Sequence, residues 1–194
     1  MSARVIPLSR IGEEVRDDEA LVAACARGEA AALGALFERH SPSVWRYLRR
    51  FLGHATDVDD LVQGTFIEAW RSAPRFRGGS SVRVWLLGIA HNLARRHARS
   101  RGRRRALLDV LSLWPVAPAR PIDELTDGRL QAVRAVALLA ELSTDHRAAL
   151  VWVDLEGVST VDTARALGVR PGTLRRRLFE ARRELRDRLG AEAP

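Results

Sequence analysis

An amphipathic helix is predicted most clearly by the stretch Asp57-Val58-Asp59-Asp60-Leu61-Val62-Gln63-Gly64-Thr65-Phe66-Ile67-Glu68-Ala69-Trp70. At 100° per residue its apolar side chains form one stripe that can face a core. The opposite side combines carboxylates with Ile67, and Trp70 lies at its margin. Scattered hydrophobic residues are common on helices that contact only water. Large hydrophobic residues beside carboxylates favour instead a docking face for a basic protein partner. The stripe consists of Val58, Leu61, Val62, Thr65, Phe66 and Ala69.

Helical periodicity continues on both sides of this stretch, and the alternation typical of strands is nearly absent. Two short amphipathic helices, separated near Gly28, are expected towards the N-terminus. The apolar pattern resumes after Pro42, a residue that is tolerated in the first turn of a helix. A loop at 75–81 precedes a helix that begins near Val82 and continues into a cluster of arginines. The expected fold class is therefore all-α.

The composition changes after this cluster, where three prolines fall close together at 115, 118 and 121. Proline-rich segments without periodicity are typical of linkers. We predict a flexible tail at 1–16, a first helical domain at 17–102, a linker at 103–128 with one short helix, and a second helical domain at 129–190. Trp114 lies in the linker and is a candidate anchor.

The positive charge of the chain is concentrated in two segments. The net charge is +8, and all 32 basic residues are arginine. Residues 95–120 hold eight arginines against one aspartate, and residues 165–189 hold nine arginines against three acidic residues. The remaining residues together are thus net acidic. This distribution favours two nucleic-acid contacts joined by a neutral or acidic scaffold.

Several classes of protein are disfavoured by the composition. A single cysteine, Cys25, excludes an internal disulfide and a cysteine-rich zinc site, and its apolar neighbours predict a buried position. The five histidines are scattered without the spacing of a metal site or a nucleophile. We expect no catalytic residue, no metal and no cofactor. With no apolar run of 18 residues and no signal peptide, we expect a cytoplasmic protein without membrane insertion.

The segment from Ser159 to Leu185 has the pattern of a helix-turn-helix. Ser159 and Asp162 can cap a short first helix, and Gly168 suits the left-handed conformation after its end. Pro171 suits the first position of the next helix. The buried stripe of this second helix should consist of Leu174, Leu178, Ala181 and Leu185, and its outward face of Gly172, Arg175, Arg176, Phe179 and Arg183.

The outward face has the chemistry of a DNA-contacting surface. Arginine can donate two hydrogen bonds to guanine, and a phenylalanine can contact the methyl group of thymine. The alternative is a basic helix face that contacts only water. Taken alone, the helix-turn-helix indicates only that the chain binds DNA.

Three motifs occur in order along the chain. The first is Asp59-Asp60-Leu61-Val62-Gln63 with Thr65-Phe66. The second is Phe76-Arg77-Gly78 with Arg83, Trp85-Leu86, Ile89-Ala90 and Asn92-Leu93-Ala94. The third is Gly172-Thr173-Leu174-Arg175 with Arg177-Leu178 and Ala181-Arg182. In this order they resemble the core-binding, promoter-opening and second DNA-recognition regions of the extracytoplasmic-function sigma factors, the small promoter-recognition subunits of bacterial RNA polymerase. The resemblance covers about residues 17–190.

The resemblance implies the function and the partners of the chain. It would bind core RNA polymerase, recognise the −35 and −10 promoter elements and assist promoter opening, with an anti-sigma factor as a candidate regulator and no small-molecule substrate. The implied core-binding residues are Asp59, Asp60, Leu61, Gln63, Ile67 and Trp70. The implied −10 residues are Arg77, Gly78, Gly79, Ser80, Arg83, Asn92, Arg95 and Arg96, whereas Trp85 is assigned to the core. The implied −35 residues are Thr173, Arg175, Arg176, Arg177, Phe179, Arg182 and Arg183.

The chain departs from the family pattern at four places. Gly64 stands where the family usually has glutamate, and inside a helix it costs about 1 kcal/mol relative to alanine. Gly79 replaces a residue that is often acidic. Thr163 places a hydroxyl near the predicted core, and Glu180 stands where relatives are often basic. Glu180 could accept a hydrogen bond from a cytosine, or pair with Arg176 or Arg183 on its own helix.

Two other classes of function would share parts of this pattern. A DNA-binding regulator that never joins polymerase would share the helix-turn-helix, but it would not need the motif of 59–66 coupled to that of 76–94. An enzyme is disfavoured because the acidic residues cluster on a helix face rather than around a pocket. Transcription by core polymerase from a specific promoter would distinguish these classes.

Overall fold

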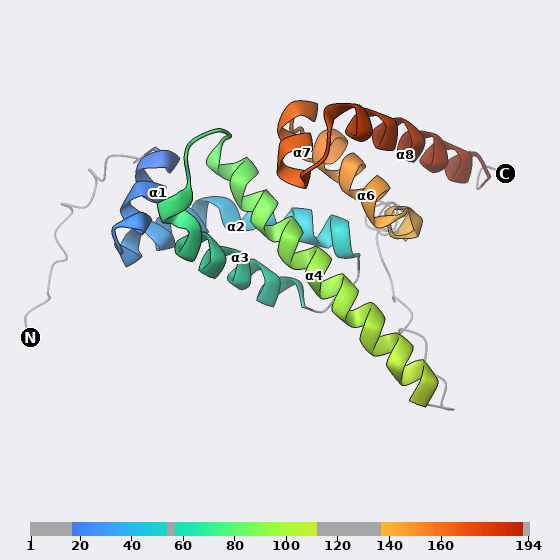
Figure 1. Cartoon of the computed structure of the whole chain (residues 1–194), viewed down its shortest axis with the longest axis horizontal. Helices are drawn as coiled ribbons and strands as arrows, with labels where there is room; N and C mark the ends of the chain where they lie inside the picture. Colours follow the sequence, from blue (N-terminus) through green and yellow to red (C-terminus); the bar gives the residue numbers. More distant parts are fainter. Residues whose placement is uncertain (1–16, 54–56, 112–136, 192–194) are drawn as a thin grey trace, which may run out of the picture.

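The computed structural model describes residues 17–53, 57–111 and 137–191, with backbone alone for 101–111 and 190–191. The first domain consists of α1 (Asp18–Ala26), α2 (Ala30–Leu52), α3 (Val58–Ser72), a 3-10 turn η1 (Ala73–Arg75) and α4 (Val82–Leu111). The second contains α6 (Thr144–Leu150), a π-helical turn η2 (Val151–Leu155), α7 (Thr160–Leu167) and α8 (Pro171–Ala191). No strand occurs within these described ranges, so the all-α prediction is confirmed (Figure 1). None of the described helices has the length and apolarity needed to cross a bilayer.

Helix α3, whose apolar stripe lies in the core of the first domain, forms as predicted. In α3, the stripe residues Val58, Val62, Phe66 and Ala69 are buried, and Leu61 is half-buried. They face α2 and α4, which pack against α3 from two sides. Because one stripe of α3 contacts both neighbours, its opposite side stays at the surface. Cys25 is buried in α1, as predicted.

The predicted helix start at Pro42 is wrong. α2 runs without interruption from Ala30 to Leu52, so Pro42 lies in its interior. An interior proline removes one backbone hydrogen bond and costs about 3 kcal/mol. Leu36 precedes Pro42, Val44 and Leu48 follow it, and all three are almost fully buried. Burial of this stripe on both sides of the proline offsets its cost.

Helix α4 is longer than the sequence suggested. It continues to Leu111 and passes the domain boundary predicted at Gly102. Its last turns extend away from the other described helices (Figure 1). The rest of the predicted linker, with Trp114 and the three prolines, and the predicted tail at 1–16 lie outside the described residues.

The helix-turn-helix is confirmed in its details. The hydroxyl of Ser159 accepts a hydrogen bond from the backbone N–H of Asp162 at 3.0 Å. Gly168 follows α7 with φ of 66°, a left-handed conformation that favours glycine. Pro171 is the first residue of α8, whose Leu174, Leu178 and Ala181 are buried. Thr163 is fully buried, and its hydroxyl has no hydrogen-bond partner among the described residues.

The two domains share one continuous buried cluster. Trp152 of η2 is fully buried, and its Nε1 donates a hydrogen bond to the hydroxyl of Tyr47 in α2 at 3.1 Å. The Tyr47 oxygen lies 2.6 Å from Nδ1 of His91 in α4. Since the indole N–H can only donate, the tyrosine hydroxyl is free to donate to a neutral His91. In the same interface α7 lies beside α4 (Figure 1).

We predict that acid destabilises this cluster. Burial, and secondarily Arg95, lowers the pKa of His91 to about 4. The unfolded chain has the ordinary histidine pKa of about 6.5 and binds its proton first as the pH falls. Stability should therefore be full above pH 6.5 and decrease down to pH 4, by about 2 kcal/mol between pH 7 and pH 5. Urea unfolding at both pH values measures this loss.

The control for this experiment is His91→Gln, which retains an acceptor for Tyr47 but does not titrate. Between pH 7 and pH 5 this variant should lose much less stability than the wild-type chain, because most of the wild-type loss comes from protonation of His91. An NMR titration showing that the His91 ring is protonated at pH 6 in the native protein would contradict the assignment.

Candidate protein and nucleic-acid interfaces

The outer side of α3 is a surface of acidic, amide and aliphatic side chains. Asp59, Asp60, Gln63 and Ile67 are exposed, and Ile67 shows 51% of its surface. Leu61 and Trp70, the other two predicted core-binding residues, are half-buried and pack against the core.

The sequence interpretation missed an aromatic residue beside this surface. Trp45 of α2 is 42% exposed, and its Nε1 donates a hydrogen bond to the Asp59 carboxylate at 3.1 Å. The guanidinium of Arg49 lies 5.5 Å from the centre of the Trp45 ring. Trp45 could have been noticed because it lies off the apolar stripe of α2. We call Trp45, Asp59, Asp60, Gln63 and Ile67 the docking face.

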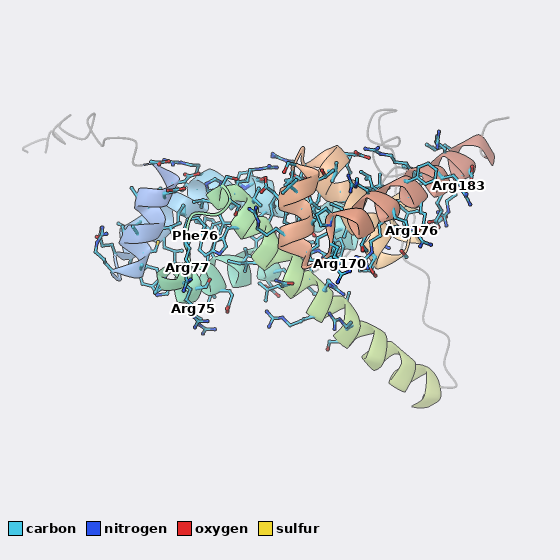
Figure 2. The ribbon with its side chains drawn as sticks, turned by 45° about the horizontal axis from the view of Figure 1, so that its top comes forward. Arg75, Phe76, Arg77, Arg170, Arg176 and Arg183 are labelled. Carbon is cyan, nitrogen blue, oxygen red and sulfur yellow. The ribbon has the colours of Figure 1, made fainter. Side chains whose placement is uncertain are left out.

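The loop before α4 presents a second set of predicted residues. Gly78 has φ of 75°, a left-handed conformation, and Arg77 and Gly79 on either side of it are exposed. The ring of Phe76 lies 4.8 Å from that of Trp85, which is half-buried against the core as predicted. Figure 2 shows Arg75, Phe76 and Arg77 together at one end of the molecule. Arg75 is exposed and was not among the predicted residues.

The remaining predicted −10 residues lie on the N-terminal half of α4 and next to it. Ser80 and Arg95 are half-buried, and Asn92 and Arg96 are exposed. Ser80, Asn92 and Arg96 line a cavity of about 400 Å³. We call the predicted −10 residues the −10 surface: Arg77, Gly78, Gly79, Ser80, Arg83, Asn92, Arg95 and Arg96.

The second domain forms one wall of this cavity. Asp162, Arg165 and Ala166 of α7 line it together with Trp85, Gly88 and Ile89 of α4. Arg165 donates a hydrogen bond to the backbone carbonyl of Gly79. Gly79, Ser80, Asn92 and Arg96 of the −10 surface therefore lie beside α7.

Arg83 is the predicted −10 residue most involved in contacts within the chain. Its Nε donates to the Ser43 hydroxyl at 3.0 Å, and its terminal nitrogens contact the Glu156 carboxylate at 2.6 Å and the Glu156 carbonyl at 3.1 Å. Glu156 follows η2, in the second domain. Arg83 is thus placed between the domains rather than on an open surface.

The outward face of α8 is exposed as predicted. Phe179 shows 63% of its surface, and Thr173, Arg175, Arg176, Arg182 and Arg183 are exposed around the helix. Figure 2 shows Arg170, Arg176 and Arg183 following one another along this side.

Three of the predicted −35 arginines are paired with carboxylates. Arg177 contacts Asp145 at 2.6 Å, Arg182 contacts Asp154 at 2.6 Å, and Arg176 contacts Glu180 at 2.8 Å. Arg175 and Arg183 have no ion-pair partner within the part of the chain that the structure describes.

Glu180 pairs on its own helix. The hydrogen bond from Arg176 lowers the pKa of Glu180, and His146 of α6 lies 3.4 Å from the same carboxylate. Of the two roles considered for Glu180, the geometry favours pairing with Arg176 over hydrogen bonding to a base.

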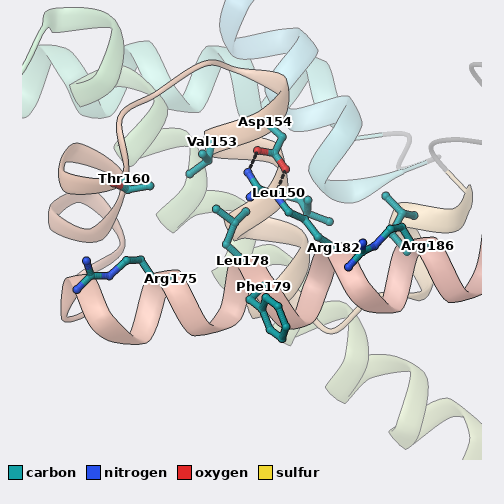
Figure 3. A pocket seen from close by; sticks show the side chains of 10 residues that line it. Leu150, Val153, Asp154, Thr160, Arg175, Leu178, Phe179, Arg182 and Arg186 are labelled. Carbon is teal, nitrogen blue, oxygen red and sulfur yellow. Dashed lines mark hydrogen bonds and ion pairs between the residues drawn. The ribbon is translucent and has the colours of Figure 1, made fainter.

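An apolar groove that the sequence did not predict lies between α8 and η2. It has a volume of about 830 Å³, and its lining combines the aliphatic side chains of Leu150, Val153, Leu178 and Leu185 with Phe179, three arginines and Asp154 (Figure 3). The Arg182–Asp154 ion pair lies at its edge, and Phe179 forms part of its wall. Phe179 therefore belongs both to the outward face of α8 and to this groove.

Comparisons with known families agree with the two-domain division. Residues 36–104 match Sigma-70 region 2, and residues 132–185 match Sigma-70, region 4. The chain is 36% identical over 178 residues to the probable RNA polymerase sigma-C factor of Mycobacterium bovis, covering 86% of this chain and 89% of the relative. It is 35% identical over 185 residues to ECF RNA polymerase sigma factor SigM of Mycobacterium tuberculosis, covering 92% and 88%.

Solved structures show the same fold. CnrH, in complex with the cytosolic domain of CnrY, superposes with a TM-score of 0.69 at 29% identity over 91% of this chain and 99% of that one. The sigma factor RpoE of Bartonella quintana, in complex with the anti-sigma factor NepR, gives 0.65 at 26% identity over 81% and 96%.

Proposed function

The chain belongs to the extracytoplasmic-function sigma factors, and from this premise we propose how its residues divide the work of promoter recognition. As a member of this family it binds core RNA polymerase, recognises the −35 and −10 elements and serves transcription initiation. We assign residues 17–102 to region 2 and residues 129–190 to region 4. The chain itself supplies binding, and the chemistry of RNA synthesis belongs to the polymerase in the cytoplasm.

The docking face is the proposed contact with core polymerase. Its carboxylates suit the basic clamp helices of the largest subunit, with Ile67 and Trp45 as apolar anchors. Aromatic residues held in one position are frequent at the energetic centres of interfaces. Asp59 orients Trp45 through its hydrogen bond, so Asp60 is the carboxylate that would meet the partner directly. The exposed Ile67 beside Asp60 is the observation on which this assignment depends.

The −10 surface is the proposed contact with the non-template strand. The loop at 77–81 would hold one unstacked base, and Asn92, Arg95 and Arg96 would contact phosphates or base edges. Unstacking costs a few kcal/mol, which contacts to the extruded base must offset.

The outward face of α8 is the proposed contact with the −35 duplex. Arg175, Arg176 and Arg183 surround Phe179 there, with Thr173 near the start of the helix. Arg177 and Arg182 support the domain through Asp145 and Asp154. An anti-sigma factor is a further proposed partner, because RpoE in the complex with NepR resembles this chain along most of its length.

Charge reversal at the docking face tests the core-binding assignment. We expect Asp60→Arg to abolish co-purification with core polymerase and transcription from a promoter used by the wild-type chain. Like charges placed opposite each other in an interface cost several kcal/mol. The control is Asp187→Arg, the same reversal at an exposed position of α8. Unchanged core binding by a folded Asp60→Arg protein would refute this face.

The salt dependence of duplex binding tests the α8 assignment. Each phosphate contact contributes about −0.9 to the slope of log K against log salt. Arg175→Ala and Arg183→Ala should each make the slope less negative by about that amount. Arg177→Ala should leave it unchanged, because its half-buried guanidinium is paired with Asp145. Equal effects of all three substitutions would mean that no ordered set of phosphate contacts exists.

A further inference from the structure

We propose that Arg176 recognises a guanine of the −35 element, and that Glu180 and His146 hold its guanidinium in the orientation that this contact requires. The inference rests on the assignment of the outward face of α8 to the −35 duplex made above, and it names the base and the positioning residues. Arg176 lies within the first two turns of α8. The N-terminal residues of a recognition helix are those that reach the edges of bases in the major groove.

The pair between Arg176 and Glu180 leaves the recognising end of the arginine free. The Nε of Arg176 donates a hydrogen bond to Oε1 of Glu180 at 2.8 Å. Within the part of the chain that the structure describes, its two terminal nitrogens have no partner, and the side chain is 80% exposed. An arginine can donate two hydrogen bonds to O6 and N7 of one guanine. Arg176 can therefore keep Glu180 and bind a base at the same time.

Glu180 is held from a second helix as well as from its own. An exposed pair four residues apart on one helix restrains a side chain only weakly. Here the other oxygen of Glu180, Oε2, lies 3.4 Å from Nε2 of His146 in α6. The side chain of His146 is 23% exposed, so it is more restrained than the residues of the outward face. With one partner at each oxygen, the Glu180 carboxylate gives Arg176 a fixed support.

The support continues beyond His146. The Nδ1 of His146 lies 3.0 Å from Glu184, and Glu184 contacts Arg188 at 2.7 Å. Arg188 also contacts Glu141, which precedes α6, at 3.2 Å. Ion pairs that form a network restrain their side chains more than an isolated surface pair does. The orientation of Arg176 is thus connected to the packing of α8 against α6.

Arg176 differs in this respect from the other arginines of the outward face. Arg175 and Arg183 are exposed and have no ion-pair partner among the described residues. Figure 2 shows Arg183 farther along the same side of α8 than Arg176. Contacts with phosphates position a protein on DNA without reading its sequence, whereas contacts with base edges specify the sequence. The restrained Arg176 suits a base contact, and the unrestrained Arg175 and Arg183 suit phosphates.

Selection of promoters by the holoenzyme tests this proposal. Core polymerase is combined with the full chain or a variant, and bound templates are recovered from a pool in which only the −35 element is randomised. The wild-type chain should favour guanine at one position, and Arg176→Ala should reduce this preference by about tenfold. Glu180→Ala should reduce the preference at the same position. Unchanged preferences at the other −35 positions show that each variant is folded.

Further variants distinguish positioning from direct reading. The double variant Arg176→Ala, Glu180→Ala should lose no more preference than Arg176→Ala alone, because Glu180 acts through Arg176. Glu180→Gln retains an acceptor for the Nε of Arg176 and should keep most of the preference. His146→Ala should weaken the preference at the same position. The control is Asp187→Ala, which removes the same charge from an exposed position of α8 and should change no preference.

The possible outcomes separate this proposal from the function on which it rests. Relaxation at different positions by Arg176→Ala and Glu180→Ala, or additive losses in the double variant, would mean that Glu180 reads a base itself and would overturn the proposal. An unchanged preference in Arg176→Ala, Glu180→Ala or His146→Ala would overturn it too, as would equal relaxation by Asp187→Ala. A wild-type holoenzyme with no preference anywhere in the −35 element would instead contradict the assignment of the outward face of α8.

Discussion

A buried carboxylate needs positive charge around it, and Glu156 finds both of its arginines on the other domain. This requirement fixes the orientation of the domains more strictly than apolar packing could. With Glu156 held between Arg50 and Arg83, Trp152 reaches Tyr47 and α7 lies along α4. Apolar contacts alone tolerate sliding, whereas an ion pair and an indole hydrogen bond specify one register.

Whether an arginine of these motifs is paired within the chain or exposed depends on whether a carboxylate lies close to it. Arg83 belongs to a motif associated with promoter opening, yet it is bound between the domains. Arg177 and Arg182 belong to the motif proposed to contact DNA, yet they form ion pairs with Asp145 and Asp154 of the same domain. Arg175 and Arg183 remain exposed on α8. The formal charge of a segment therefore overstates the number of cations that can meet DNA.

Features that depend on neighbours in the sequence were predictable. The stripe of α3, the Ser159 cap, the left-handed Gly168 and the start of α8 at Pro171 each follow from residues within a few positions of one another. Pairing of Glu180 with Arg176 was one of the two predicted roles, and it too depends on near neighbours, since the two residues are four positions apart on one helix. The three motifs, found in one order along the chain, were also enough to indicate the protein family.

Features that depend on distant residues were not predictable. Tyr47 and Trp152 are 105 positions apart, and neither residue indicates its partner by local pattern. The position of Pro42 inside α2 depends on burial on both sides of it, and the hydrogen bond between Trp45 and Asp59 joins two helices. The placement of Arg83 against Glu156 likewise required the arrangement of the domains. Sequence motifs indicated the residues proposed for the −10 contact, but not the residues of α7 that lie beside them.

The position of Glu156 between Arg50 and Arg83 implies one fixed arrangement of the two domains in the free chain. Spin labels at Ala31→Cys and Asp187→Cys, in a Cys25→Ala background, allow the distance between the domains to be measured by pulsed electron resonance. The free chain should give one narrow distance distribution, because the Glu156 ion pairs and the Trp152 hydrogen bond specify a single arrangement. A broad distribution, or several separate distances, would contradict this arrangement.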